Sequence, residues 1–215
     1  MNAQAQKISI MLDLQRSMNS KVNSDWATQG FEWHRAIWVE CAELMDHYGW
    51  KWWKKQTPDT EQVALELIDI WHFGLSILLQ SARPQEELIA QVQASLAIST
   101  SEKDFRLDLE KFVAATLGDR QFHIDLFGRL MAGIDMTFEQ LYSGYVGKNV
   151  LNFFRQDHGY KDGSYRKHWH DGREDNEHLV EAVQSLDADK ANFKDELYQA
   201  LVQRYSNSPR QELPA

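Results

Sequence analysis

The sequence predicts an all-α fold. Apolar residues recur at helical spacing through most of the 215 residues, and the apolar/polar alternation of a half-buried strand is almost absent. Proline, which interrupts helices, occurs only four times. With 43% hydrophobic residues, the chain is long enough for one substantial core. We therefore expect a single multi-helix domain over 1–215, built from a rigid four-helix core and a mobile helical part, with a flexible tail over 206–215.

The first two predicted helices cover 8–18 and 28–48. Gln15 and Asn19 lie on one side of the end of the first, because residues four apart share a helix face; an ordinary polar helix end is the alternative. The second helix ends at Gly49, a typical helix stop. It carries Glu40 and Glu43 on the flank of an apolar stripe.

Three tryptophans are interleaved with three lysines over 50–55. One interpretation is core packing with solvated lysines. The other is a surface for a planar ring and a phosphate, because indoles stack on rings and ammonium groups bind phosphate. The sequence favours neither.

The helix predicted from Pro58 and Asp59 to about Arg83 is apolar on nearly every side. Its polar residues form one narrow stripe, with His72 at the margin: Gln62, Glu66, Asp69, Ser76 and Gln80. We expect Glu66 and Asp69 to face a buried cleft. The apolar run over 68–79 is too short to span a bilayer.

The rest of the chain is predicted as further helices joined by polar connections. The helices are expected over 86–97, 104–117, 121–132, 137–155, 174–186 and 192–205. Those over 104–117 and 121–132 are expected to be bundle helices without chemistry.

Two carboxylate pairs predict a metal site. Glu40 with Glu43, and Glu66 with Asp69, are each three residues apart and so share a helix face. If the two helices pack antiparallel, four carboxylates converge. Two charges about 4 Å apart repel by roughly 4 kcal/mol at an effective dielectric of 20, so a cation is needed. All-oxygen ligands favour Mg²⁺ or Mn²⁺ over zinc. A solvated helix face is the alternative for each pair alone.

Charge is distributed unevenly along the chain. The formal net charge of -9 argues against general binding to nucleic acid or anionic membranes. However, 145–173 holds six Lys or Arg against three Asp. Glycines in 159–165 permit close backbone approach, and Lys and Arg bind phosphate oxygens. This segment is therefore predicted to contact a polyphosphate, with an ordinary surface loop as the alternative.

The cellular location is predicted from the N-terminal residues and from the single cysteine. The first ten residues show no charged leader and apolar run, so we expect no signal peptide. Cys41 cannot form an internal disulfide and is expected to be a small buried apolar residue. We expect a cytoplasmic protein.

Carboxylates that hold a divalent metal, together with a basic loop, suggest hydrolysis of a nucleoside triphosphate. A metal-activated water would attack, and the basic residues would stabilise the leaving pyrophosphate. Phosphate-binding loops of the P-loop type are absent from the sequence.

The order of motifs resembles the dimeric dUTPases, within the all-α NTP pyrophosphatases. The resemblance runs from about 14 to 176 through Leu14-Gln15 with Asn19, Glu40-Cys41-Ala42-Glu43-Leu44, Trp50-Lys51-Trp52-Trp53-Lys54, Glu66-Leu67-Ile68-Asp69-Ile70-Trp71-His72-Phe73, Tyr145-Val146-Gly147-Lys148-Asn149-Val150-Leu151-Asn152, Phe154-Arg155-Gln156, Gly159-Tyr160-Lys161-Asp162-Gly163-Ser164-Tyr165 and Trp169. The region over 80–137 matches least.

The resemblance implies a homodimer that uses Mg²⁺ to hydrolyse dUTP, and also dUDP, to dUMP. It implies that Glu40, Glu43, Glu66 and Asp69 bind the metal, with Glu40 or Glu43 activating water. Gln15 and Asn19 would read uracil, and Trp52 or Trp53 would line the base pocket. The expected contacts to sugar and phosphates are Lys148, Asn149, Asn152, Arg155, Lys161 and Tyr165, with Lys54 and His72 as further members. The glycine loop is expected to order over the phosphates.

Three other functions remain open from the sequence. A pyrophosphatase for dCTP or a damaged nucleotide would share the metal site. A di-iron bundle protein would need two Glu-x-x-His pairs, which neither carboxylate pair forms. A non-catalytic acidic module would leave the basic loop unexplained.

Overall fold

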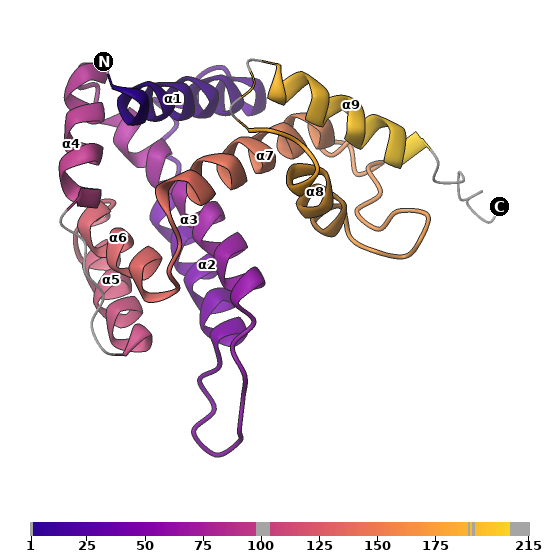
Figure 1. The fold of residues 1–215 in the computed structure, drawn as a ribbon. Helices are drawn as coiled ribbons and strands as arrows, with labels where there is room; N and C mark the ends of the chain where they lie inside the picture. Colours follow the sequence, from indigo (N-terminus) through magenta and orange to yellow (C-terminus); the bar gives the residue numbers. More distant parts are fainter. Residues whose placement is uncertain (1, 98–103, 189, 191, 207–215) are drawn as a thin grey trace. The chain divides into compact units, whose positions relative to one another are not determined.

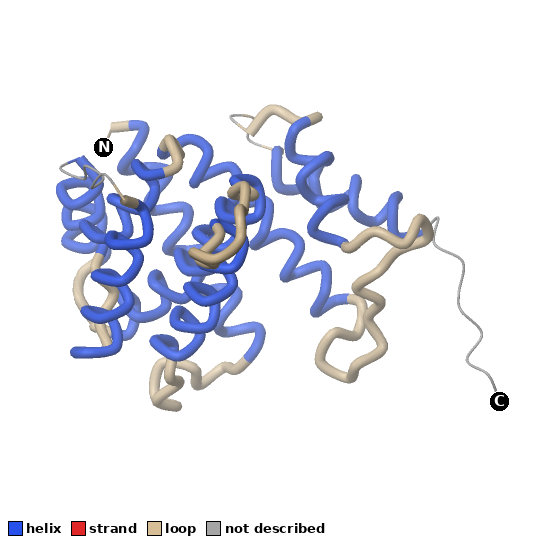
Figure 2. Tube along the Cα trace, turned by 90° about the horizontal axis from the view of Figure 1, so that it is seen from below, coloured by secondary structure: helices blue, strands red, loops and turns tan. Residues whose placement is uncertain are grey.

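The computed structural model describes residues 2–97, 104–188, 190 and 192–206. Within these residues it is helical, without a named strand (Figures 1 and 2). The helices are α1 Ala3–Val22, α2 Trp33–Tyr48, α3 Thr60–Gln80, α4 Gln85–Ala97, α5 Phe105–Asp119, α6 Ile124–Gly133, α7 Phe138–Asp157, α8 Asp175–Gln184 and α9 Phe193–Ser206. The all-α prediction is confirmed.

Several predicted boundaries were wrong by a few residues. Helix α1 is longer than predicted at both ends. It begins earlier because Asn2 caps its first turn by accepting a hydrogen bond from the Ala5 N–H. Helix α2 begins at Trp33 rather than 28, after a turn that contains Gly30 at a φ of 67°. Its predicted end at Gly49, with a φ of 93°, is confirmed. Of the tail predicted over 206–215, Ser206 is the last residue of α9, and 207–215 lie outside the described residues.

The chain forms two compact units, 1–145 and 146–215, and the boundary falls within α7. The prediction of a single domain stays a prediction. In the first unit α2 and α3 pack against each other, with α1 and α4 to α6 around them. In the second unit α8 packs against α9.

Helix α3 supplies most of the first unit's core. Its buried apolar side chains include Val63, Leu67, Ile70, Trp71 and Leu75. At 21 residues it is long and apolar enough to cross a membrane, unlike the shorter run considered from the sequence. However, 67% of its most apolar stretch is buried inside the protein, as in a core helix. Of its polar residues, Glu66, His72 and Ser76 are therefore buried in the interior of the fold.

Candidate functional site

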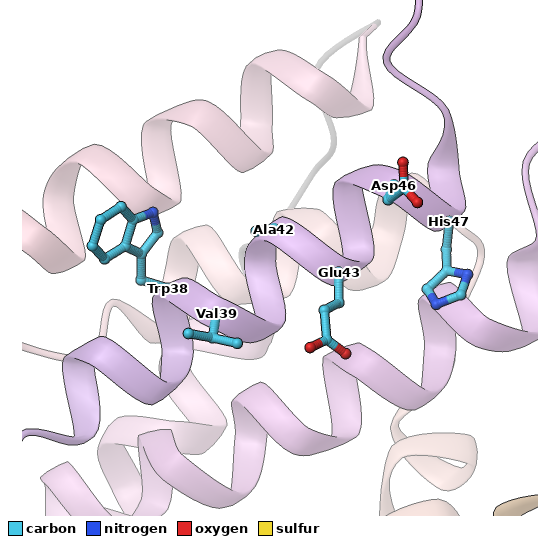
Figure 3. A pocket seen from close by; sticks show the side chains of 6 residues that line it. All are labelled: Trp38, Val39, Ala42, Glu43, Asp46 and His47. Carbon is cyan, nitrogen blue, oxygen red and sulfur yellow. The ribbon is translucent and has the colours of Figure 1, made fainter. Parts of the chain in front are cut away.

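Three carboxylates meet where α2 packs against α3. One oxygen from each of Glu40, Glu43 and Glu66 lies within 4.8 Å of the other two. Glu66 is buried, Glu40 is half-buried and Glu43 is exposed. Figure 3 shows Glu43 and His47 pointing to the same side of α2, and His47 Nε2 lies 3.7 Å from Glu66 Oε1. We call Glu40, Glu43, Glu66 and Asp69 the carboxylate cluster.

The electrostatic repulsion within this cluster appears as a raised pKa of Glu40. Burial, and then the negative charge of Asp69, raise the pKa of Glu40 to about 8. A hydrogen bond with Glu66 and the charges of Glu66 and Glu43 add to the rise. Asp69 thus acts on Glu40 through its charge, although it is not among the three residues whose oxygens lie within 4.8 Å of one another. Without a cation, the cluster therefore favours a proton on Glu40 at neutral pH.

Cys41 lies beside the cluster but takes no part in it. Its side chain is 2% exposed, and burial with the charge of Glu40 raises the pKa of its thiol. It is the small buried apolar residue that the sequence predicts.

An open hollow of about 550 Å³ adjoins the cluster on α2. Glu43 and His47 line it together with Trp38, Val39 and Ala42, and with Asp46. Trp38 and Val39 are 54% and 53% exposed. One side of the cluster is thus open, beside apolar side chains that are about half exposed.

A second group of polar side chains is buried between α1, α3 and the first part of α7. Gln15 Nε2 donates to Asn19 Oδ1 at 2.9 Å and to Ser76 Oγ at 3.1 Å. Asn19 Nδ2 donates to Ser76 Oγ at 3.0 Å. Gln15 Oε1 lies 2.8 Å from His72 Nδ1 and accepts from Tyr145 Oη at 3.0 Å. We call these five residues the amide network; it contains both predicted base readers.

The tryptophans of 50–53 lie on the surface. Trp50, Trp52 and Trp53 are 45%, 90% and 56% exposed, so the core-packing interpretation was wrong for them. By sequence these residues and Lys54 fall in the connection between α2 and α3, which Figure 1 shows at the end of the α2–α3 pair that lies away from α1. The structure does not bring Trp52 or Trp53 beside Gln15 and Asn19, and their role in a base pocket stays a prediction.

In the second unit, Arg155 is held by a buried carboxylate. Its Nε and Nη2 each donate to Asp175 at 2.8 Å, and its Nη1 donates to Asn152 Oδ1 at 3.2 Å. Tyr165 Oη also donates to Asp175, at 2.7 Å. Burial alone would raise the pKa of Asp175, but the hydrogen bonds and charge of Arg155 outweigh it and hold that pKa below its usual range.

The other predicted phosphate ligands differ in exposure. Lys148 and Asn149 are buried, at 5% and 1% exposed, and Lys148 Nζ donates to Asn176 Oδ1 at 3.2 Å. Lys161 is exposed, in a loop where Gly159 and Gly163 have positive φ. Together with Asn152, Arg155 and Tyr165, these residues belong to the second unit, and their role in phosphate binding stays a prediction.

Sequence reasoning missed Tyr145 and Asp175. By its spacing Tyr145 fits the apolar side of its helix, and Asp175 lies in none of the motifs. A buried tyrosine hydroxyl usually needs a partner, which was a usable signal for Tyr145. Asp175 had no comparable signal. Arg155 lies in a segment rich in basic residues, and nothing in that pattern indicates which acidic residue pairs with it.

Comparison with known proteins gives a match to a protein family. The sequence model of a protein family described as dUTPase matches residues 7–160, a span that contains the whole carboxylate cluster and the whole amide network. No match was found among curated proteins.

Proposed function

The chain belongs to the all-α dUTPase family and is a dUTP diphosphatase, and we propose that it hydrolyses dUTP to dUMP and pyrophosphate at the carboxylate cluster. The observation that carries this proposal is the convergence of Glu40, Glu43 and Glu66 within 4.8 Å. Like charges at this distance repel each other, and burial increases the free-energy cost of each charge. Binding of a cation explains why a buried carboxylate lies beside two others.

The donor set of the cluster fits a divalent metal ion. All of its ligand atoms are carboxylate oxygens, and the raised pKa of Glu40 marks an excess of negative charge. We propose Mg²⁺, with Mn²⁺ as a substitute, held by Glu40, Glu43, Glu66 and Asp69. Such an ion neutralises phosphate charge and makes water a stronger nucleophile at neutral pH.

The chain's own groups would complete the reaction. Glu40 or Glu43 would accept the proton of the attacking water, because both lie in the cluster and Glu43 reaches its open side. Gln15 and Asn19 would read the uracil edge, since a carboxamide offers both a donor and an acceptor. The proposed ligands of sugar and phosphates are Lys148, Asn149, Asn152, Arg155, Lys161 and Tyr165, with Trp52, Trp53, Lys54 and His72 as further substrate contacts.

Three wider properties are also proposed. The enzyme would cleave dUDP to dUMP and phosphate, since the same cluster would serve a shorter phosphate chain. It would act as a homodimer, which the exposed Trp38 and Val39 beside the cluster support. It would work in the cytoplasm, as its sequence leads us to expect.

A nucleotide panel tests the proposal. The purified protein is incubated with dUTP, dUDP, dCTP, dTTP and UTP, with Mg²⁺, with Mn²⁺ and with EDTA, and released pyrophosphate and phosphate are followed. We expect fast cleavage of dUTP and dUDP that stops in EDTA. Equal cleavage of dCTP would contradict the base assignment. Full activity in EDTA would contradict the metal assignment.

A further inference from the structure

The carboxamide of Gln15 has no hydrogen-bonding capacity left for a ligand. A glutamine amide has two N–H donors and an oxygen with two lone pairs. In the amide network both donors are used, toward Asn19 and Ser76. The oxygen is contacted by His72 Nδ1 at 2.8 Å and by Tyr145 Oη at 3.0 Å. Gln15 is 4% exposed, so it can meet a nucleobase only by breaking one of these bonds.

Asn19 differs from Gln15 in this respect. Its Nδ2 donates one hydrogen to Ser76 Oγ, and among the contacts of the described residues the second hydrogen has no acceptor. Its Oδ1 accepts from Gln15 at 2.9 Å and from Ser76 at 3.4 Å. Asn19 therefore offers a spare N–H. This donor matches the O4 carbonyl of uracil and opposes the 4-amino group of cytosine.

The direction of that donor depends on the orientation of Gln15. If the Gln15 amide turned over, its oxygen would face Asn19, and Asn19 would turn to donate to it. The Asn19 oxygen would then be left for the base, which favours the amino group of cytosine over the carbonyl of uracil. The two orientations have nearly the same shape, so only the surrounding donors can select between them.

Two groups can make that selection. His72 Nδ1 can donate to Gln15 Oε1 when this nitrogen carries the ring proton. Tyr145 Oη donates toward two oxygens, the Met11 carbonyl at 2.9 Å and Gln15 Oε1 at 3.0 Å. Its one proton is shared between them, so the hydroxyl contributes part of a hydrogen bond to Gln15 Oε1. The Tyr145 ring is fully buried and stacks on His72 with centroids 4.2 Å apart, which fixes both donors.

We propose that Tyr145 and His72 are positioning residues that hold Gln15 Oε1 toward themselves and so leave the Asn19 N–H free for the uracil carbonyl. Asn19 then reads the base, and Gln15 sets the direction in which it reads. The inference rests on the proposed function, in that the base is taken to bind beside Gln15 and Asn19. It changes the role of Gln15 from contacting the base to orienting Asn19, and it adds what selects uracil over cytosine.

The sharpest variant is Tyr145→Phe, which removes only the hydroxyl and keeps the stacked ring. We expect the ratio of kcat/KM for dUTP to kcat/KM for dCTP to fall by about tenfold, mainly through a higher KM for dUTP at nearly unchanged kcat. Tyr142→Phe is the matched control, because it removes a hydroxyl one turn away on the same helix. It should leave the ratio within about twofold. An unchanged ratio in Tyr145→Phe would overturn the proposal.

Variants of His72 separate positioning from packing. In His72→Asn the side-chain N–H₂ takes the place of Nδ1 and can still donate, so we expect the dUTP preference to be largely kept. His72→Leu has no donor and should lose it. Equal loss in both variants, at matched melting temperatures, would mean that the imidazole acts through packing alone.

The protonation of the ring can be tested without any variant. In a long-range ¹H–¹⁵N spectrum of the full-length protein we expect His72 to carry its proton on Nδ1. A proton on Nε2 would overturn the proposal, whatever the activity. If the wild-type enzyme itself fails to prefer dUTP over dCTP, the base assignment in the proposed function fails, and the spectrum still decides the orientation of Gln15.

Discussion

The carboxylate cluster and the amide network both include residues of α3 but have opposite characters. In the cluster, burial and neighbouring charges raise the pKa of Glu40 to about 8, so the cluster is under strain without a cation. In the network, every hydrogen-bonding position of Gln15 is satisfied by the protein itself. Helix α3 thus supplies one site that a ligand must complete and one that is organised in advance.

Glu66→Gln should give the largest effect and tests the cluster directly. We expect kcat/KM for dUTP to fall by about 10²-fold or more, because a metal ligand is lost. The melting temperature in EDTA should stay the same or rise, because a source of repulsion is removed. Steady-state kinetics measure kcat/KM for dUTP, and thermal unfolding in EDTA measures the melting temperature.

Glu61→Gln is the control for this variant, since Glu61 is exposed in the first turn of the same helix. It should change neither quantity. A Glu66→Gln enzyme with normal activity would remove Glu66 from the site.

Metal binding should release a proton from Glu40. The pKa of Glu40 is about 8 in the folded protein against an ordinary value of 4.5, so in the absence of metal most molecules are protonated there at pH 7. The apparent Mg²⁺ affinity should therefore increase by up to about tenfold per pH unit below pH 8 and level off above it. Calorimetry in two buffers of different ionisation enthalpy measures the released proton. The same binding enthalpy in both buffers would contradict this.

The same shift predicts how the stability of the metal-free protein depends on pH. A folded pKa above the unfolded one gives a contribution that is fully present below about pH 4.5 and is lost as pH rises through about 8. In EDTA the Glu40 contribution to the free energy of unfolding should thus decline across this range. Saturating Mg²⁺ should remove the decline, as urea titrations at several pH values would show.

Ser76→Ala tests the organised site through stability. The Ser76 hydroxyl accepts from both Gln15 and Asn19, and its loss leaves buried donors unsatisfied. We expect the free energy of unfolding to fall by about 1–3 kcal/mol. Ser143→Ala, at a half-buried serine of α7 whose hydroxyl donates to the Gln140 carbonyl of its own helix, should have little effect. A Ser76→Ala protein as stable as the wild type would mean that the hydrogen bonds to Ser76 Oγ do not stabilise the fold.

Trp52→Ala should have the smallest effect on folding. The side chain is 90% exposed, so the free energy of unfolding should change by no more than about 0.5 kcal/mol. If Trp52 lines the base pocket, the KM for dUTP rises several-fold at unchanged stability. Thermal unfolding and KM, measured on the same preparation, separate these two effects, and an unchanged KM would remove Trp52 from the pocket.

Periodicity was sufficient to predict the helices and the carboxylate cluster. Glu40 and Glu43, like Glu66 and Asp69, each share a helix face by spacing alone, and an apolar helix with one polar stripe has to bury that stripe. The helix ends were harder to predict, because they depend on single caps and turns such as Asn2 and Gly30.

Periodicity could not predict the amide network. It joins Gln15 to Ser76 and to Tyr145, which are 61 and 130 positions away in the sequence. Tyr145 follows the apolar pattern of its helix, and only its hydroxyl, placed by tertiary packing, gives it a role. Partners that distant are set by how whole helices pack, which no local pattern encodes.

The buried pair of Arg155 and Asp175 has a consequence for how the chain can vary. Arg155 closes α7 onto Asp175, and Tyr165 is tied to the same carboxylate, so the intervening segment is a loop with both ends fixed. The entropy of closing such a loop grows slowly, by about 0.6 kcal/mol for each doubling of its length. Residues inserted between Gly159 and Ser164 would therefore add little loop-closure entropy, but they would break the turn in which the Ser164 and Tyr165 N–H groups donate to the Gly159 carbonyl. The two anchors would still hold the flanking backbone, so the expected loss is that of the turn and not of the second unit.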